Sequence, residues 1–174
     1  MFADPVKNLR ALGLTENMIV ADLGAGAGFY TLPAAAIATS GKVYAVEVVK
    51  DYLPLIQSKA KSAHLNNIEV IWGNVEKPSG TKLKDGIANA VIASNILFQV
   101  EDRNNFIAEI KRILHRDGQV LLIDWSDSSG AAGLVSHAII PKEEARKMFE
   151  DRGFVFAGNI DPGAHHYGMI LKKQ

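Results

Sequence analysis

The sequence predicts an α/β protein whose doubly wound, mostly parallel sheet of seven strands carries helices on both faces. Short apolar runs alternate with longer segments of helical spacing along the chain, which is typical of parallel strands joined by crossover helices. A glycine-rich turn separates the first apolar run from an alanine-rich helical segment, as in nucleotide-binding sheets. Because no repeat or compositional break interrupts this pattern, we expect a single domain over residues 1–174.

Individual elements follow from hydrophobic spacing and from turn residues. The predicted strands cover residues 18–20, 42–49, 68–72, 87–93, 120–125, 154–157 and 166–172. The predicted helices cover residues 4–12, 31–39, 51–65, 101–116 and 141–152. Asp117-Gly118 is expected to end the fourth helix, and residues 78–86, rich in turn formers and lysine, are expected to form a surface loop.

Composition narrows the classes of partner. Apolar residues make up 48% of the chain and charged residues 22%, which suits one globular domain with a sizeable core. Nineteen basic residues balance nineteen acidic ones, so no overall positive field draws the protein to nucleic acid or to an anionic membrane. We therefore expect a small-molecule partner, with no nucleic acid and no membrane.

The absence of cysteine excludes disulfides, thiolate metal sites and a cysteine nucleophile. Residues 1–12 include Asp4, Lys7 and Arg10 and lack the continuous apolar core of a signal peptide. No apolar run approaches the length of a membrane span. We expect a soluble cytoplasmic protein.

The glycine turn carries the main functional signal. Gly24, Gly26 and Gly28 remove three β-carbons where the backbone turns and where a ligand can lie against it. A dinucleotide fingerprint would place its third glycine at position 29, which is Phe29. Asp22, just before the turn, would repel a pyrophosphate but attract an ammonium or sulfonium group. The turn is therefore suited to a cationic ligand.

The stretch Asp22-Leu23-Gly24-Ala25-Gly26-Ala27-Gly28 resembles the first motif of class I S-adenosylmethionine-dependent methyltransferases. This resemblance implies S-adenosyl-L-methionine as the cofactor and a Rossmann-like methyltransferase fold, in which a hairpin-like ending makes the last strand antiparallel. The segment after residues 120–125 corresponds to the one that shapes the acceptor pocket in the small-molecule group of ubiquinone and menaquinone biosynthesis.

Two further residues extend the predicted cofactor site. Glu47 ends the second strand nineteen residues after Gly28, where an acid can accept both ribose hydroxyls; a solvated strand-end acid is the alternative. Asn74 stands where the family usually has an aspartate that binds the adenine amine; its side-chain carbonyl could do the same, or could stabilise its own turn. The predicted cofactor-binding residues are Asp22, Gly24, Ala25, Gly26, Gly28, Tyr30, Glu47, Val48, Asn74, Val75, Ser94 and Asn95.

The loop of residues 94–99 is expected to face the methyl group, because open α/β sheets place their chemistry at the carboxyl ends of strands. It lacks the Pro-Pro-aromatic motif of amino-methylating relatives and the paired acids of magnesium-dependent ones, so we predict no metal. Phe98, Trp125 and Tyr167 are the predicted apolar walls for an acceptor that lies between this loop and a flap at residues 126–140.

Methyl transfer from a sulfonium mainly requires alignment of nucleophile, methyl and sulfur. If the acceptor must lose a proton, Asp124, His137, His165 and His166 are the candidate bases, with structural or surface roles as the alternative. The sequence thus favours methyl transfer to a small molecule. The alternatives are a nicotinamide-dependent oxidoreductase, disfavoured by the glycine spacing, and a non-catalytic S-adenosylmethionine-binding module.

Overall fold

The computed structural model describes residues 4–126 and 139–174, which contain seven strands and five helices. The strands are β1 (Ile19–Leu23), β2 (Lys42–Glu47), β3 (Ile68–Trp72), β4 (Ala88–Ser94), β5 (Leu114–Trp125), β6 (Phe154–Ile160) and β7 (His166–Lys173). The helices are α1 (Pro5–Ala11), α2 (Thr31–Ile37), α3 (Tyr52–Ser62), α4 (Arg103–Ile113) and α5 (Lys142–Glu150).

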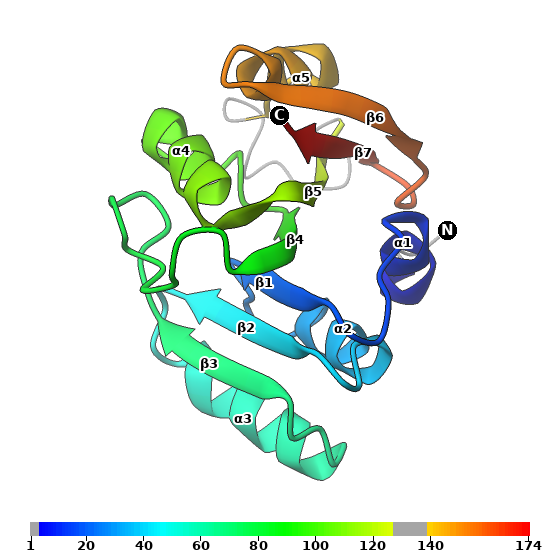
Figure 1. The fold of residues 1–174 in the computed structure, drawn as a ribbon, viewed down its shortest axis with the longest axis vertical. Coiled ribbons are helices and arrows are strands. Elements are labelled where there is room, and N and C mark those ends of the chain that lie inside the picture. Colours follow the sequence, from blue (N-terminus) through cyan, green and yellow to red (C-terminus); the bar gives the residue numbers. More distant parts are fainter. Residues whose placement is uncertain (1–3, 127–138) are drawn as a thin grey trace.

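All seven strands form one sheet in the order β3-β2-β1-β4-β5-β7-β6 (Figure 1). β7 runs antiparallel to both of its neighbours, β5 and β6, whereas β1 to β5 pair in parallel. The predicted doubly wound α/β fold with an antiparallel last strand is confirmed. Strand order reverses between β1 and β4, and such a switch point opens a crevice at the carboxyl ends of the strands.

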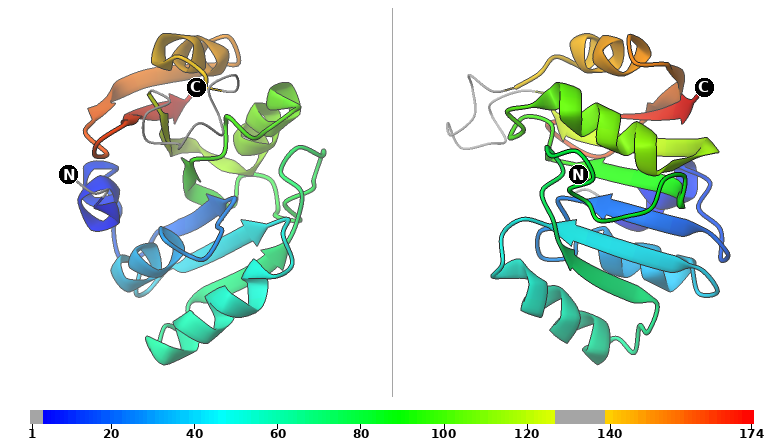
Figure 2. Two further views of the ribbon diagram at one scale, coloured as in Figure 1. Left: turned by 180° about the vertical axis from the view of Figure 1, so that it is seen from behind. Right: turned by 60° about the vertical axis from the view of Figure 1, so that its left-hand side comes forward.

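Successive side chains along each strand point to opposite faces of the sheet, so an apolar core forms on each face. On one face α1 and α2 pack through Leu9 and Ala34 against strand residues that include Val43. α3 lies on the same face, because its Ile56 packs on Ala45, two residues from Val43. On the other face α4 and α5 cover the sheet with a core that includes Phe106 and Phe149 (Figure 2).

The boundary between α4 and β5 differs from the prediction. α4 ends at Ile113, and β5 begins at Leu114, so Asp117 and Gly118 lie within the strand instead of ending the helix. Leu114 already pairs with Ala88, but the register shifts before Gln119 pairs with Ala90. The extra residues between these two pairs interrupt the regular pairing, which the local spacing of apolar residues does not reveal.

The connection between β3 and β4 also departs from the expected surface loop. Thr81 is fully buried and Leu83 is 7% exposed. The buried carboxylate of Glu109 on α4 accepts hydrogen bonds from Ser79 N (3.1 Å), Thr81 N (3.1 Å) and Thr81 Oγ1 (2.6 Å). Arg112 donates to Glu109 Oε1 (2.7 Å) and to Leu83 O (2.8 Å). This network fixes the crossover against α4.

We predict that Glu109→Ala lowers the free energy of unfolding by about 3–5 kcal/mol, because it leaves the buried N–H of Thr81 without its acceptor and removes the buried partner of the Arg112 charge. The control is Asp117→Ala in the Arg116–Asp117 pair, whose side chains are 86% and 82% exposed; it should leave stability unchanged within error. Urea unfolding followed by circular dichroism measures both. Equal shifts of the two midpoints would contradict the assigned role of Glu109.

Candidate cofactor site

The glycine turn leaves β1 directly at Leu23 and has positive φ angles at Gly24 (+72°) and Gly26 (+52°). A β-carbon on Gly24 would lie 2.5 Å from Ile96 Cδ1, so the loop after β4 packs directly against the turn. A β-carbon on Gly26 would meet nothing within 4 Å. The two glycines therefore have different roles. The missing side chain of Gly24 lets the loop after β4 pack against the turn, whereas that of Gly26 leaves open space.

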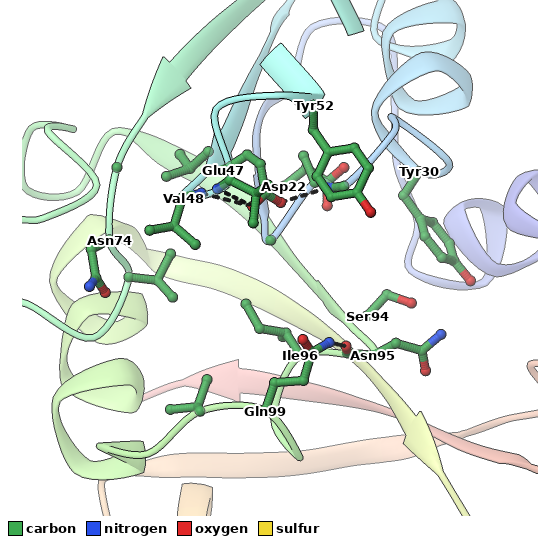
Figure 3. A pocket seen from close by; sticks show the side chains of 18 of the residues that line it. Asp22, Tyr30, Glu47, Val48, Tyr52, Asn74, Ser94, Asn95, Ile96 and Gln99 are labelled. Atoms are coloured by element: carbon green, nitrogen blue, oxygen red, sulfur yellow. Dashed lines mark hydrogen bonds between the residues drawn. The ribbon is translucent and has the colours of Figure 1, made fainter. Parts of the chain in front are cut away.

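That space is part of a cavity of about 610 Å³ at the switch point of the sheet, within the size range of small-molecule sites (Figure 3). The glycine turn and the segments that follow β2, β3 and β4 form its walls. Of the predicted cofactor-binding residues, the cavity brings together Asp22, Gly24, Ala25, Gly26, Tyr30, Glu47, Val48, Asn74, Val75, Ser94 and Asn95. Gly28 does not line it; a β-carbon there would contact Ile56 and Leu32 instead.

Glu47 joins the end of β2 to the glycine turn. Its side chain is 6% exposed, and its Oε2 accepts from Gly26 N at 2.8 Å. Its Oε1 accepts from Val48 N and Val49 N, each at 2.8 Å. These backbone donors hold a carboxylate in the cavity wall beside Gly26. The alternative of a solvated strand-end acid therefore does not fit Glu47.

Asp22 is a second buried carboxylate in the same wall, 3% exposed. Burial raises its pKa to about 6, the hydrogen bond from Thr31 Oγ1 (2.5 Å) offsets part of this rise, and the charge of Glu47 adds to it. Two carboxylates in one wall give the cavity a negative potential. A cation beside Asp22 would favour its charged form.

The end of β4 forms a polar corner with α1 and α2. Tyr30 OH accepts from Asn8 Nδ2 of α1 at 2.9 Å and shares a hydrogen bond with Ser94; burial raises the pKa of Tyr30. Asn95 adopts a positive φ of 54°, and its buried Oδ1 has no hydrogen-bond partner among the described residues. Figure 3 shows Tyr30, Ser94 and Asn95 on the same side of the cavity.

Asn74 lines the opposite end of the cavity, beside Val48 and Val75. Its Oδ1 accepts from Glu76 N at 2.8 Å, which is the local turn hydrogen bond that the sequence left as an alternative. The carbonyl retains a second lone pair on a residue that borders the cavity.

The cavity also contains residues outside the predicted cofactor-binding set, although two of them, Ile96 and Gln99, belong to the loop of residues 94–99 that is expected to face the methyl group. Phe29 (57% exposed) and Tyr52 (39% exposed) are apolar at its border, and Ile96, Gln99 and Val100 come from the loop after β4. Tyr52 is the first residue of α3 and follows the end of β2 closely, so the topology of the sheet could have identified it. The sequence identifies Phe29 only as the residue at the position where a dinucleotide fingerprint has its third glycine.

The predicted acceptor residues lie outside this cavity. Phe98 is half-buried, Trp125 stacks on His166 with ring centroids 4.1 Å apart, and Tyr167 is 6% exposed. Because Asp124 pairs with Tyr167 and Trp125 with His166, Tyr167 and Trp125 occupy opposite faces of the β5–β7 pair. The structure therefore does not bring these predicted walls together in one described cavity.

The candidate bases have diverse surroundings. Asp124 is 2% exposed, and its carboxylate accepts from Trp125 N (2.8 Å) and Phe98 N (3.3 Å). His166 Nδ1 lies 2.8 Å from Ala164 O, and its buried Nε2 has no partner within residues 4–126 and 139–174. His165 precedes β7 with a φ of +64° and is exposed, and His166 is the first residue of the strand. His137 and most of the predicted flap fall outside the described residues.

Within residues 4–126 and 139–174, no three histidine, aspartate or glutamate side chains gather in an arrangement that could hold a metal ion. No helix in the same part of the chain is both long and apolar enough to cross a membrane.

The chain is similar to known methyltransferases in both sequence and structure. Residues 14–156 match the sequence model of a family described as a methyltransferase domain. A crystal structure of an S-adenosylmethionine-dependent methyltransferase from Aquifex aeolicus superposes with a TM-score of 0.90 at 25% identity, covering 99% of this chain and 91% of the other.

Two provisionally assigned methyltransferases share the fold. One, of type 11, from Sulfolobus solfataricus has a TM-score of 0.79 at 23% identity and covers 100% of this chain and 94% of its own. The other, from Bacillus halodurans, has a TM-score of 0.78 at 18% identity and covers 97% and 96%. The family match over residues 14–156 confirms the predicted resemblance, and the chain belongs to the methyltransferase domain family as a class I methyltransferase.

Proposed function

We propose that this enzyme transfers a methyl group from S-adenosyl-L-methionine to a small-molecule acceptor by in-line displacement. The observation that carries the proposal is the cavity of about 610 Å³ in which the open space over Gly26 borders two buried carboxylates, Asp22 and Glu47. S-adenosylmethionine is the cofactor, and it brings both a sulfonium and an ammonium cation. The negative potential of the wall matches these charges.

The residues present fit the parts of this cofactor. Asp22 and the turn at Gly24 and Gly26 provide acceptors and space for the aminoacyl end. Glu47 would accept from the ribose hydroxyls, because it is already oriented by three backbone N–H groups. Val48, Val75 and Asn74 would hold the adenine at the far end of the cavity. Each proposed role thus belongs to a predicted cofactor-binding residue that lines the cavity.

The bound cofactor supplies an activated methyl group whose leaving sulfur departs uncharged, so the protein's task is alignment and exclusion of water. Asp22 and Glu47 would hold the donor in one orientation, and the loop that contains Ile96 closes the wall against Gly24. Asp124, His165 and His166 remain proposed bases for an acceptor that must lose a proton, together with His137. None of the first three lines the described cavity.

The proposed acceptor is a small molecule because the chain carries nineteen basic and nineteen acidic residues and thus has no excess charge for a phosphate backbone. We place it beyond the loop of residues 94–99, on the side of Phe98. The methyltransferase family match disfavours the nicotinamide oxidoreductase alternative. The remaining alternative, a module that binds S-adenosylmethionine without turnover, predicts that no methyl group is transferred to any acceptor.

Glu47→Ala should weaken binding of S-adenosylhomocysteine, the demethylated product, at least tenfold in calorimetry. The change removes charge-assisted hydrogen bonds, each worth about 1.5–3 kcal/mol. The matched control is Glu69→Ala on the neighbouring strand β3, where the acid is exposed and pairs with Lys42 at 2.5 Å outside the cavity. Equal affinities of wild type and Glu47→Ala would show that the ribose assignment is wrong.

Gly26→Val should abolish cofactor binding in a protein that still folds, because the new side chain enters the open space of the cavity. The control is Gly86→Val, which has a similar positive φ (+65°), also meets nothing within 4 Å, and lies outside the cavity. Both variants carry backbone strain of about 1–2 kcal/mol, so thermal unfolding should shift alike. Loss of binding in both, or an unfolded Gly26→Val variant, would count against the assigned role.

The reaction itself is tested with S-adenosylmethionine that carries a labelled methyl group. We expect label in a small-metabolite fraction and none in ribosomal RNA, with Gly26→Val as the inactive control. Label in ribosomal RNA alone, or salt-sensitive binding to RNA at micromolar concentration, would overturn the small-molecule acceptor. Cofactor binding without label in any fraction would identify the non-catalytic module.

A further inference from the structure

Asp124 bridges two segments at the carboxyl edge of the sheet. It is the second-last residue of β5 and is 2% exposed. Its Oδ1 accepts from Trp125 N at 2.8 Å, within its own strand, whereas its Oδ2 accepts from Phe98 N at 3.3 Å. Leu97 N also donates to this carboxylate. The side chain thereby connects the end of β5 to the loop that follows β4.

An acid at this position is costly for the fold taken alone. Burial raises the pKa of Asp124 to about 6, while the three backbone N–H groups and the charge of His166 offset part of that rise. The residues around it, including Leu97, Leu122 and Tyr167, belong to the apolar core that α4 and α5 cover. A buried charge is tolerated only where hydrogen bonds compensate it, and the loop after β4 supplies part of that compensation for Asp124.

The loop held by Asp124 forms one wall of the cofactor cavity. Ile96, Gln99 and Val100 line the cavity on either side of the anchored Leu97 and Phe98. Ile96 Cδ1 occupies the space next to Gly24 that a β-carbon would need, with 2.5 Å between the two positions. Gln99 Nε2 donates to Asn95 O at 2.7 Å and closes the loop on itself. A displacement of Leu97 and Phe98 would therefore move Ile96 away from the glycine turn.

We propose that Asp124 is a positioning residue for methyl transfer, which holds residues 96–100 against the glycine turn and so sets the wall of the cofactor cavity. This inference rests on the proposed function of the cavity. Both carboxylate oxygens accept backbone N–H groups, and through Phe98 N the side chain acts on the loop.

The test compares Asp124→Asn with Glu109→Gln. Glu109 is also 2% exposed and accepts backbone N–H groups, from Ser79 and Thr81, but it lies outside the cavity. Each amide keeps the size of the acid and one acceptor oxygen, and each loses the second acceptor. Amide hydrogen exchange is measured in the ligand-free proteins, and affinity for S-adenosylhomocysteine is measured by calorimetry where circular dichroism shows that both variants are folded.

We expect Asp124→Asn to accelerate exchange at Leu97 and Phe98 at least tenfold and to weaken S-adenosylhomocysteine at least fivefold. Glu109→Gln should accelerate exchange at Ser79 and Thr81 and leave the affinity within twofold of wild type. Unchanged exchange at Leu97 and Phe98, or unchanged affinity in Asp124→Asn, would overturn the inference, as would an equal loss of affinity in Glu109→Gln. Failure of the wild type to bind S-adenosylhomocysteine would instead overturn the proposed function, since the exchange measurement needs no ligand.

Discussion

Backbone N–H groups just beyond the carboxyl ends of the strands have no partner within the sheet, and in this protein buried carboxylates satisfy several of them. Glu47 accepts from Gly26, Val48 and Val49, and Asp124 accepts from Phe98 and Trp125. Unpaired buried donors are costly, so each acid converts an irregular segment into a fixed one. The position of the cavity walls therefore depends on these side chains.

These buried carboxylates concentrate negative charge at one edge of a sheet in a chain whose acidic and basic residues are equal in number. The chain has nineteen residues of each sign, yet Asp22, Glu47 and Glu76 all line the cavity. Because Asp22 is buried beside Glu47, its pKa is raised to about 6. A site with two nearby buried acids disfavours phosphate ligands and favours cationic ones, which agrees with a sulfonium donor and disfavours a dinucleotide.

Local signals in the sequence were sufficient for the turn and for the sheet. The sequence could identify four residues of the cavity wall, because a strand, a turn and the next strand fix their relative positions over a short stretch. These residues are Asp22, Gly24, Gly26 and Glu47. The start of β5 and the burial of Thr81 could not be identified, since both depend on partners distant in sequence: Ala88 for the strand and Glu109 for the loop. The partners of Asp124 and the place of Tyr52 in the cavity wall likewise come from tertiary contacts.

The position of β7 inside the sheet has a consequence for where this chain can be shortened. The family match ends at residue 156, but β7 (His166–Lys173) lies between β5 and β6 and pairs with both. At the other end, Asn8 on α1 precedes the matched residues and donates to Tyr30 in the cavity wall. A chain trimmed to residues 14–156 would leave β5 with an exposed edge and Tyr30 without its amide donor. The stretch that sequence relatedness delimits is therefore smaller than the stretch that folds together.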